Sequence, residues 1–242
     1  MLTEYDRERY DRQIMIPEIG EAGQARLQKA VVFIAGAGGL GSSVALYLAA
    51  AVGSLRIVDN DTVTLSNLNR QILHGDPDID KPKAGSAEEA LARLNARVRL
   101  DCSADTITPG NVVDLVRGSD LVVDALDNIE TRLLMNKAAL NLKTPLVHGA
   151  VSGFEGRAMV VLPGKTACLG CFVRGKPQPG KFPVLGTTPA VIGAIQATEA
   201  VKALTGAGRL LAGRLLRYDG LALEFSEFKI NQNPQCPDCG RK

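Results

Sequence analysis

Short apolar runs alternate with longer, helix-like stretches up to Gly149. The first run, 31–35 (VVFIA), ends in a glycine-rich loop, 36–41 (GAGGLG), and the segment that follows is rich in alanine and leucine. This order predicts a strand, a tight loop and a helix. Because strands that alternate with helices form mainly parallel sheets, we expect a Rossmann-like α/β fold with helices on both faces. The further strands are predicted at 55–58, 98–100, 121–123 and 146–147, and the helices at 42–51, 83–95 and 128–142.

The pattern changes after Gly149. Apolar and polar residues alternate in 222–230, and 156–162 and 214–218 also have strand composition. These strands predict an antiparallel extension of the same sheet. Pro189 opens an apolar helix that runs to Ala203, a position where proline is well tolerated. The stretch 172–188 between them holds Pro, Gly and Lys without periodicity, which predicts an exposed, mobile loop.

Composition limits the classes of function. The chain has 242 residues, of which 45% are hydrophobic and 22% charged, and its net charge is +2. These values are typical of a globular protein and give no basic field, so neither nucleic acid nor a membrane is an expected partner. The N-terminus has no apolar signal region and the apolar runs are shorter than a membrane span. We therefore expect a cytoplasmic protein, in which paired cysteines hold metal more often than they form disulfides.

The glycine loop and Asp59 are the candidate nucleotide site. Glycines let the backbone approach a phosphate closely, and the following helix offers unpaired N–H groups to the anion. Asp59 ends the second apolar run, where an acid accepts hydrogen bonds from ribose hydroxyls. Alone, this pair is equally typical of a nicotinamide-dependent oxidoreductase, and glycines also serve simply as turn formers.

Two Cys-x-x-Cys pairs predict a structural zinc site. They are Cys168 with Cys171 and Cys236 with Cys239. Two such knuckles complete a tetrahedral site of four cysteines that leaves no open position for water. A redox dithiol is the competing interpretation, which two matching pairs disfavour. Cys102, the fifth cysteine, follows a short strand and is interpreted as a small, partly buried hydrophobe rather than a nucleophile.

Several further motifs carry a family resemblance. They are 9–13 (RYDRQ), the glycine loop, 65–71 (LSNLNRQ), Lys83, the Asp127–Asn128 pair and both cysteine pairs. In order and spacing they resemble the MoeB/ThiF/HesA adenylyltransferases, relatives of the ubiquitin-activating enzymes. The resemblance covers nearly the whole chain. It implies a single adenylation domain over 1–242, with N-terminal helices in 1–29, a nucleotide-binding half in 30–149 and a carrier-binding, zinc-containing half in 150–242.

The resemblance also implies roles for individual residues. Asp59 would hold the ribose, Asp127 would help to place Mg²⁺, and Arg12 would reach into the site of a partner subunit in a homodimer. The implied catalytic residues are Arg12, Arg70, Lys83 and Asp127. The implied ATP-binding residues are Gly36, Gly38, Gly39, Gly41, Asp59, Asp61, Ser66, Asn67, Arg70, Gln71, Lys83, Asp127 and Asn128.

Spacing alone leaves other interpretations open for some of these residues. Arg12 could be a solvated charge on an N-terminal helix, and Asp127 could cap the helix that begins at Ile129. His74 and His148 are both interpreted as structural.

Fixed cations and Mg²⁺ around a triphosphate would stabilise the charge that develops when a carboxylate attacks the α-phosphate.

The function implied is ATP-dependent adenylation of the C-terminal Gly-Gly carboxylate of a ubiquitin-like sulfur-carrier protein. Because 172–188 contains no cysteine, a separate protein is expected to donate the sulfur. Arg174, Lys176 and Lys181 would attract an acidic carrier or simply be solvated. Adenylation of a small-molecule or tRNA-linked carboxylate is the nearest alternative. A nucleotide-binding scaffold is another, and an oxidoreductase would leave Arg70, Lys83 and Asp127 without a task.

Overall fold

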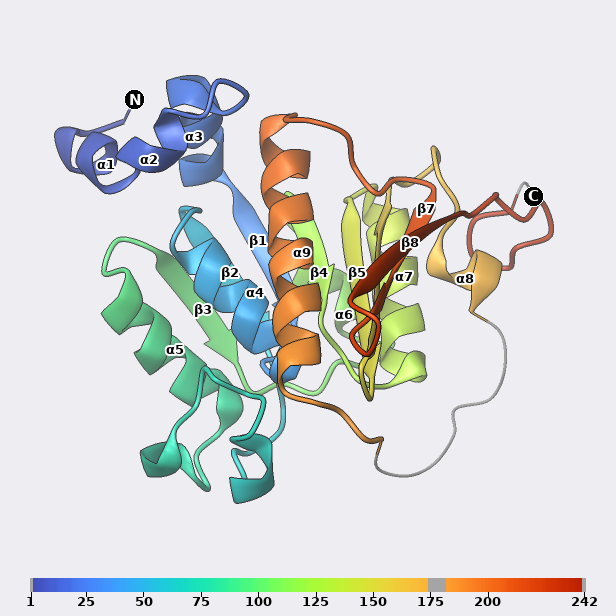
Figure 1. Cartoon of the computed structure of the whole chain (residues 1–242), viewed down its shortest axis with the longest axis horizontal. Coiled ribbons are helices and arrows are strands. Elements are labelled where there is room, and N and C mark those ends of the chain that lie inside the picture. The colour runs from blue at the N-terminus through green and yellow to red at the C-terminus, as the bar shows by residue number, and fades with distance from the viewer. Residues whose placement is uncertain (1, 174–181, 241–242) are drawn as a thin grey trace.

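The computed structural model describes residues 2–173 and 182–240 and confirms the predicted fold class. Eight strands form one sheet in the order β3-β2-β1-β4-β5-β6-β7-β8 (Figure 1). The first five strands pair in parallel and the last three extend the sheet in antiparallel fashion. Their bounds are β1 Val31–Ala35, β2 Ser54–Val58, β3 Arg99–Ser103, β4 Leu121–Asp124, β5 Leu146–Ser152, β6 Glu155–Val161, β7 Arg214–Asp219 and β8 Glu224–Lys229.

Helices cover both faces of the parallel part of the sheet (Figure 1). Residues of α3, α4, α5 and α9 share one buried cluster with the sheet, and residues of α6, α7 and α8 share the other. The α-helices are α1 Glu4–Arg9, α2 Asp11–Ile14, α3 Gly20–Lys29, α4 Gly39–Ala49, α5 Lys83–Leu94, α6 Val112–Val116, α7 Ile129–Leu142, α8 Leu169–Phe172 and α9 Thr187–Thr205; the short 3₁₀ helices are η1 Leu65–Asn67 and η2 Asp76–Asp78. Nowhere in these ranges is there a helix with the length and apolar character needed to span a membrane.

The strand β1 shows why the parallel strands are continuously apolar. Val32 and Ile34 pack under α4 and α9, whereas Phe33 and Ala35 face α7 on the other side. All four side chains are fully buried because each face of the sheet carries a layer of helices. This burial is the main source of stability for the half of the molecule that holds the glycine loop.

Some elements differ in extent from the sequence expectation. The strand β5 continues to Ser152 because its second half pairs with β6, although these residues are less apolar than 146–147. The helix α9 begins at Thr187, so Pro189 lies inside the first turn, where its missing N–H leaves no intrahelical bond unmade. The five-residue helix α6 was not predicted, because it is too short to show helical periodicity.

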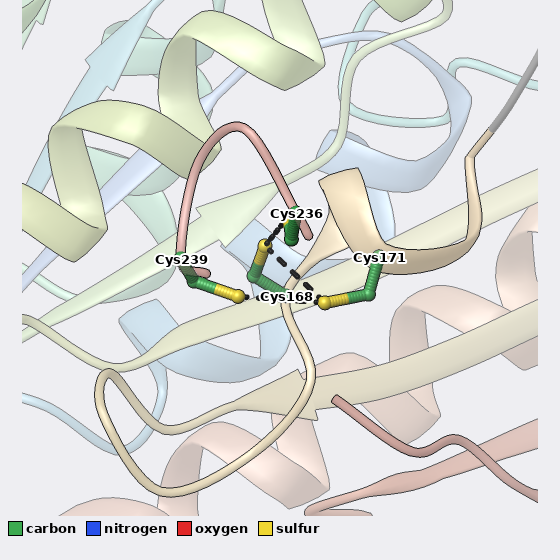
Figure 2. A group of neighbouring side chains, drawn as sticks. All are labelled: Cys168, Cys171, Cys236 and Cys239. Carbon is green, nitrogen blue, oxygen red and sulfur yellow. Dashed lines mark hydrogen bonds between the residues drawn. The ribbon is translucent and has the colours of Figure 1, made fainter. Parts of the chain in front are cut away.

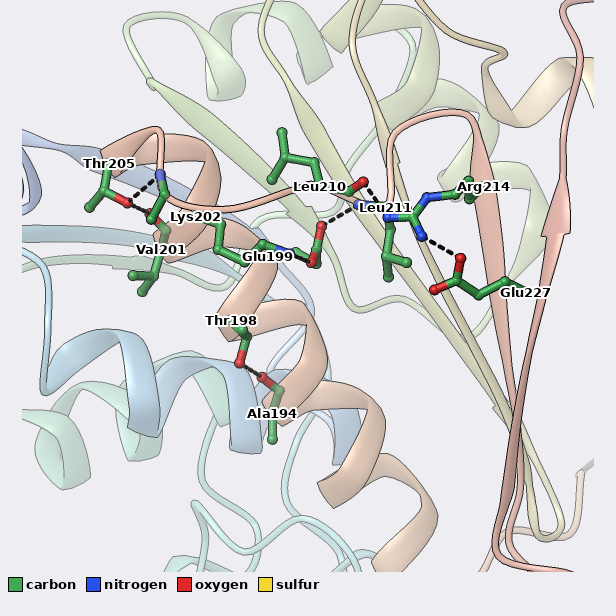
Figure 3. A network of polar contacts seen from close by, with 11 residues as sticks. Ala194, Thr198, Glu199, Val201, Lys202, Thr205, Leu210, Leu211, Arg214 and Glu227 are labelled. Atoms are coloured by element: carbon green, nitrogen blue, oxygen red, sulfur yellow. Dashed lines mark hydrogen bonds and ion pairs between the residues drawn. The ribbon is translucent and has the colours of Figure 1, made fainter. Parts of the chain in front are cut away.

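The C-terminal end of α9 is fastened to the antiparallel extension, as Figure 3 shows. The Leu211 N–H donates to Glu199 at 2.6 Å, and Arg214 donates to the Leu210 carbonyl at 2.7 Å. Arg214 also pairs with Glu227 on β8. The first bond ties α9 to the loop that leads into β7, and the pairing of Arg214 with Glu227 joins β7 to β8.

Candidate active site

The glycine loop connects β1 to α4. At two of its positions the backbone accepts only glycine. Gly36 has φ +97°, a conformation that other residues rarely adopt. A Cβ on Gly41 would lie 1.9 Å from the Gly36 carbonyl oxygen, so the loop folds back on itself too tightly for any side chain. The first N–H groups of α4 are thereby left facing the carboxyl edge of the parallel strands, where an anion binds most favourably.

We predict that Gly41→Ala abolishes ATP binding and destabilises the protein. A methyl group there collides with rigid backbone, and the loop must open to relieve the collision. The matched control is Gly85→Ala, in α5, where an added Cβ meets nothing within 4 Å. This control should raise stability by about 0.5–1 kcal/mol, since alanine favours the helix. Thermal melts and ATP titrations measure both effects; equal behaviour of the two variants would contradict the loop geometry.

The residue Ala37 in the loop is held at both of its backbone groups. Its N–H donates to Asp59 at 2.7 Å, and its carbonyl oxygen lies 3.0 Å from His74 Nε2. The other ring nitrogen of His74 lies 2.8 Å from Ser86 Oγ, and burial lowers the pKa of His74, so the neutral ring donates to Ala37. The structural interpretation of His74 thus fits this geometry. Sequence reasoning missed the contact with Ala37, because nothing in the spacing connects these positions.

The segment 65–71 lies beside the loop. Asn67 closes a small capping turn with Thr64, and Arg70 donates to the Ser66 carbonyl at 3.0 Å. A Cβ on Gly39 would approach Arg70 Cγ at 3.6 Å and Pro189 at 3.2 Å, so Arg70 and the start of α9 flank the loop. Gln71 is buried near Gly38, and its Oε1 has no partner among the described residues.

Lys83 begins α5 and points toward the same edge of the sheet. Its side chain is buried, and its ammonium group pairs with Asp61 at 2.8 Å. Asp61 follows Asp59 closely and donates its N–H to the Asp59 carboxylate at 2.9 Å. The structure therefore brings the predicted residues Asp59, Asp61 and Lys83 together.

Asp127 and Asn128 follow β4, next to the glycine loop. A Cβ on Gly36 would lie 2.9 Å from the carbonyl oxygen of Ala125, which places this turn against the loop. Asn128, not Asp127, caps α7, because its side chain accepts a hydrogen bond from Thr131 N–H at 2.9 Å. The interpretation of Asp127 as the cap is therefore wrong. Asp127 is exposed and has no hydrogen-bond or ion-pair partner among the described residues.

Arg12 is not brought to this site within one chain. It lies exposed on α2, and α1, α2 and α3 lie at the end of the sheet opposite to the start of α4 (Figure 1). The charges predicted to steer a carrier, Arg174, Lys176 and Lys181, lie outside the described residues. The adjoining residues 182–186 lie against the turn between β5 and β6, where the Gly153 N–H donates to the Pro183 carbonyl at 2.7 Å.

The two cysteine pairs converge between the start of α8 and the C-terminal tail (Figure 2). Their Sγ atoms all lie within 4.8 Å of one another, with separations of 3.7 Å between Cys168 and Cys236 and 3.4 Å between Cys171 and Cys239. Four thiolates about 2.3 Å from a zinc ion form a tetrahedron with edges of about 3.8 Å. The arrangement therefore fits Zn²⁺ in a closed, structural site.

Asn136 on α7 supports both halves of this cluster. Its side-chain Oδ1 accepts a hydrogen bond from Leu169 N–H at 3.0 Å, and its Nδ2 donates to Asp238 at 3.1 Å. Residues of this kind orient the ligands of a metal site. Sequence reasoning missed Asn136, because it lies far along the chain from either pair.

Cys102 lies apart from the cluster, on β3. Burial raises the pKa of its thiol to about 12, so very little thiolate forms at neutral pH. This agrees with its interpretation as a partly buried hydrophobe.

The fold and the site define the class: a Rossmann-like nucleotide-binding protein with a glycine loop at the edge of a parallel sheet and a separate four-thiolate cluster. The model of the ThiF family matches residues 10–238. The chain belongs to the ThiF family, which confirms the resemblance found in its motifs.

The sequence similarity to three relatives covers nearly the whole chain. The sulfur carrier protein adenylyltransferase of Thermus thermophilus is 43% identical, covering 98% of this chain and 92% of the relative. The SAMP-activating enzyme E1 of Haloferax volcanii is 44% identical, covering 96% and 88%. Protein HesA of Trichormus variabilis is 37% identical, covering 99% and 91%.

Solved structures confirm the fold. MccB of E. coli, in a structure with MccA-N7isoASN, superposes with a TM-score of 0.88 at 22% identity, covering 96% of this chain and 75% of that one. PaaA superposes with a TM-score of 0.84 at 24% identity, covering 96% of this chain and 76% of that one. These similarities concern the architecture alone.

Proposed function

We propose that the chain is an ATP-dependent adenylyltransferase that activates the C-terminal Gly-Gly carboxylate of a ubiquitin-like sulfur-carrier protein as an acyl adenylate, releasing pyrophosphate. One observation carries the proposal. The glycine loop, Asp59, Arg70 and Lys83 gather at one edge of the sheet in a chain that matches a sulfur carrier protein adenylyltransferase along 98% of its length.

The charges at this edge suit nucleotidyl transfer. When a carboxylate attacks the α-phosphorus, the bond to the bridging oxygen breaks, and negative charge accumulates on the phosphoryl oxygens and on departing pyrophosphate. Arg70 and Lys83 are fixed by neighbouring groups, so they can stabilise that charge without reorganising. Arginine suits a bidentate phosphate contact, and lysine acts as a point charge.

Asp127 fits a role in holding Mg²⁺. Its side chain is exposed on a turn whose preceding residues pack against Gly36, and hard divalent cations prefer oxygen ligands. A bound Mg²⁺ would supply further positive charge near the phosphates. No general base is needed, because the attacking carboxylate is already ionised at neutral pH.

A homodimer would complete the site. The position of α2 at the far end of the sheet keeps Arg12 away from its own chain's glycine loop (Figure 1). If Arg12 contributes to catalysis, it must reach the site of a second copy. We therefore propose that the active form is a homodimer in which each Arg12 serves the partner subunit.

The sulfur should come from another protein. Four of the five cysteines form the cluster, where a thiolate bound to zinc is unavailable for transfer. Cys102 remains protonated at neutral pH because burial raises its pKa. Neither the four clustered thiolates nor the Cys102 thiol is suited to attack an acyl adenylate. A separate thiol or persulfide donor is therefore proposed.

Carrier-dependent exchange of radiolabelled pyrophosphate into ATP tests the function. We expect exchange with an intact Gly-Gly-tailed carrier and none with a carrier that lacks the tail. Asp127→Asn, which keeps the size of the side chain but removes its charge, should reduce exchange by about 10²-fold or more, since it weakens a charge-stabilising group. ATP binding without exchange for every carrier would instead favour a scaffold or a small-molecule carboxylate.

A further inference from the structure

A buried polar network lies under the Asp127 turn, on the α7 side of the sheet. Asp124 ends β4 and His148 lies on β5; both are almost completely buried. His148 Nδ1 is 2.7 Å from Asp124 Oδ2, and Arg132 Nε is 3.9 Å from Asp124 Oδ1. The network also holds Leu126, whose N–H donates to Asp124 at 3.2 Å and whose carbonyl accepts from Arg132. Leu126 directly precedes Asp127.

Two atoms of this network lack a hydrogen-bond partner among the described residues. His148 Nε2 and Arg132 Nε are buried and make no hydrogen bond to any described residue. Both residues line a small, partly open cavity of about 20 Å³, together with Arg157 and apolar side chains. A cavity needs on the order of 10–15 Å³ to hold one water molecule. Buried polar groups nearly always have a hydrogen-bond partner, so the cavity has the size and the lining for one small polar occupant.

The chemistry of the two atoms selects that occupant. His148 donates a hydrogen bond from Nδ1–H to the Asp124 carboxylate, and burial lowers the pKa of His148 even though Asp124 raises it, so the ring is neutral. Its Nε2 is then an acceptor, whereas Arg132 Nε–H is a donor. The occupant must donate one hydrogen bond and accept another. An anion such as chloride cannot donate, and the nearby guanidinium groups of Arg132 and Arg157 repel a metal cation.

We propose that this cavity is a binding site for one water molecule, which joins His148 to Arg132, and that His148 is thereby a positioning residue for the turn that carries Asp127. The water completes the ring of contacts around Leu126, so loss of the water leaves Arg132 Nε without a hydrogen bond and loosens the turn. The water site does not depend on the proposed function. Its consequence for Asp127 rests on the proposed function.

Nuclear magnetic resonance of the zinc-loaded, ¹⁵N-histidine-labelled protein tests the water site. The chain has two histidines, and the structure requires opposite tautomers. His74 Nε2 must carry its proton because it faces the Ala37 carbonyl, whereas His148 must carry its proton on Nδ1. We expect these two tautomers, with a cross-peak between long-lived water and Arg132 Hε. A proton on His148 Nε2, or an Arg132 Hε without a water contact, overturns the site.

Two substitutions test the positioning role. His148→Asn keeps a donor toward Asp124 but withdraws the acceptor from the cavity, whereas His148→Leu removes both. We expect His148→Asn to remain folded, to lose the water cross-peak, and to need several-fold more Mg²⁺ for half-maximal pyrophosphate exchange. His148→Leu should show a larger Mg²⁺ effect and lower thermal stability.

The Mg²⁺ requirement separates the possible outcomes. A purely structural histidine would change the amount of folded protein without changing the Mg²⁺ concentration at half-maximal exchange. An unchanged Mg²⁺ requirement in a folded His148→Asn variant that has lost the water therefore overturns the positioning role. Absence of exchange in the unsubstituted protein would instead count against the proposed function, and the tautomer and water measurements would still decide the water site.

Discussion

Cys236→Ser is expected to lower the thermal midpoint by about 10 °C and to release the bound zinc. The four Sγ atoms lie within 4.8 Å of one another, and Cys168 and Cys171 are buried against α7. Without the metal, protonated or like-charged sulfurs must share this space, and the C-terminal tail loses its main attachment. Loss of a structural metal belongs to the largest effects of single substitutions, about 3–5 kcal/mol. In a protein of this size each kcal/mol shifts the midpoint by about 2–4 °C.

Chelation and a matched cysteine variant make this prediction specific. A strong chelator should lower the midpoint of the unsubstituted protein toward that of Cys236→Ser and should leave the variant unchanged. Cys102 lies outside the cluster, so the Cys102→Ser variant should retain zinc and show only a small shift in its thermal midpoint. Scanning calorimetry with metal analysis measures both quantities. A Cys236→Ser protein with full zinc content and an unchanged midpoint would show that the cluster is not a zinc site.

The fold was predictable because its signals are local. Runs such as 31–35 are apolar on both faces, which is typical of a strand inside a sheet that helices cover on both sides. The cysteine cluster was predictable for the same reason, since each pair carries its spacing within four residues. The ends of elements were less certain. β5 extends to Ser152 because of pairing with β6, a partner that the sequence of β5 does not reveal.

The supporting contacts of the site were not predictable. His74 reaches Ala37, and Asn136 reaches Asp238, across long stretches of chain. Such contacts depend on how two helices or strands are placed in space, and they leave no periodicity or spacing in one sequence. The buried pair of Asp124 and His148 is a further example, because each residue ends an apolar run and looks like an ordinary strand terminus. Motifs predicted the residues that are proposed to surround the reaction, whereas the residues that hold them in place required the structure.

Lys83→Met should reduce pyrophosphate exchange by about 10²–10³-fold while the protein stays folded. A fixed cation stabilises charge that develops only in the transition state, so its loss falls mainly on the maximal rate. Methionine matches the length of the buried lysine stem. The partner left behind, Asp61, has a side chain that is 62% exposed, so its carboxylate stays hydrated and costs little stability.

Lys81→Met is the matched control, two residues away. Lys81 pairs with Asp78 at 3.1 Å and with Glu89 at 3.5 Å, and these residues line an open groove separate from the glycine loop. We expect this variant to exchange pyrophosphate at nearly the rate of the unsubstituted protein. ATP titrations of both variants separate binding from chemistry, since a ground-state role for Lys83 would weaken ATP binding as much as it slows exchange. Equal exchange rates in Lys83→Met and Lys81→Met would remove Lys83 from the catalytic residues.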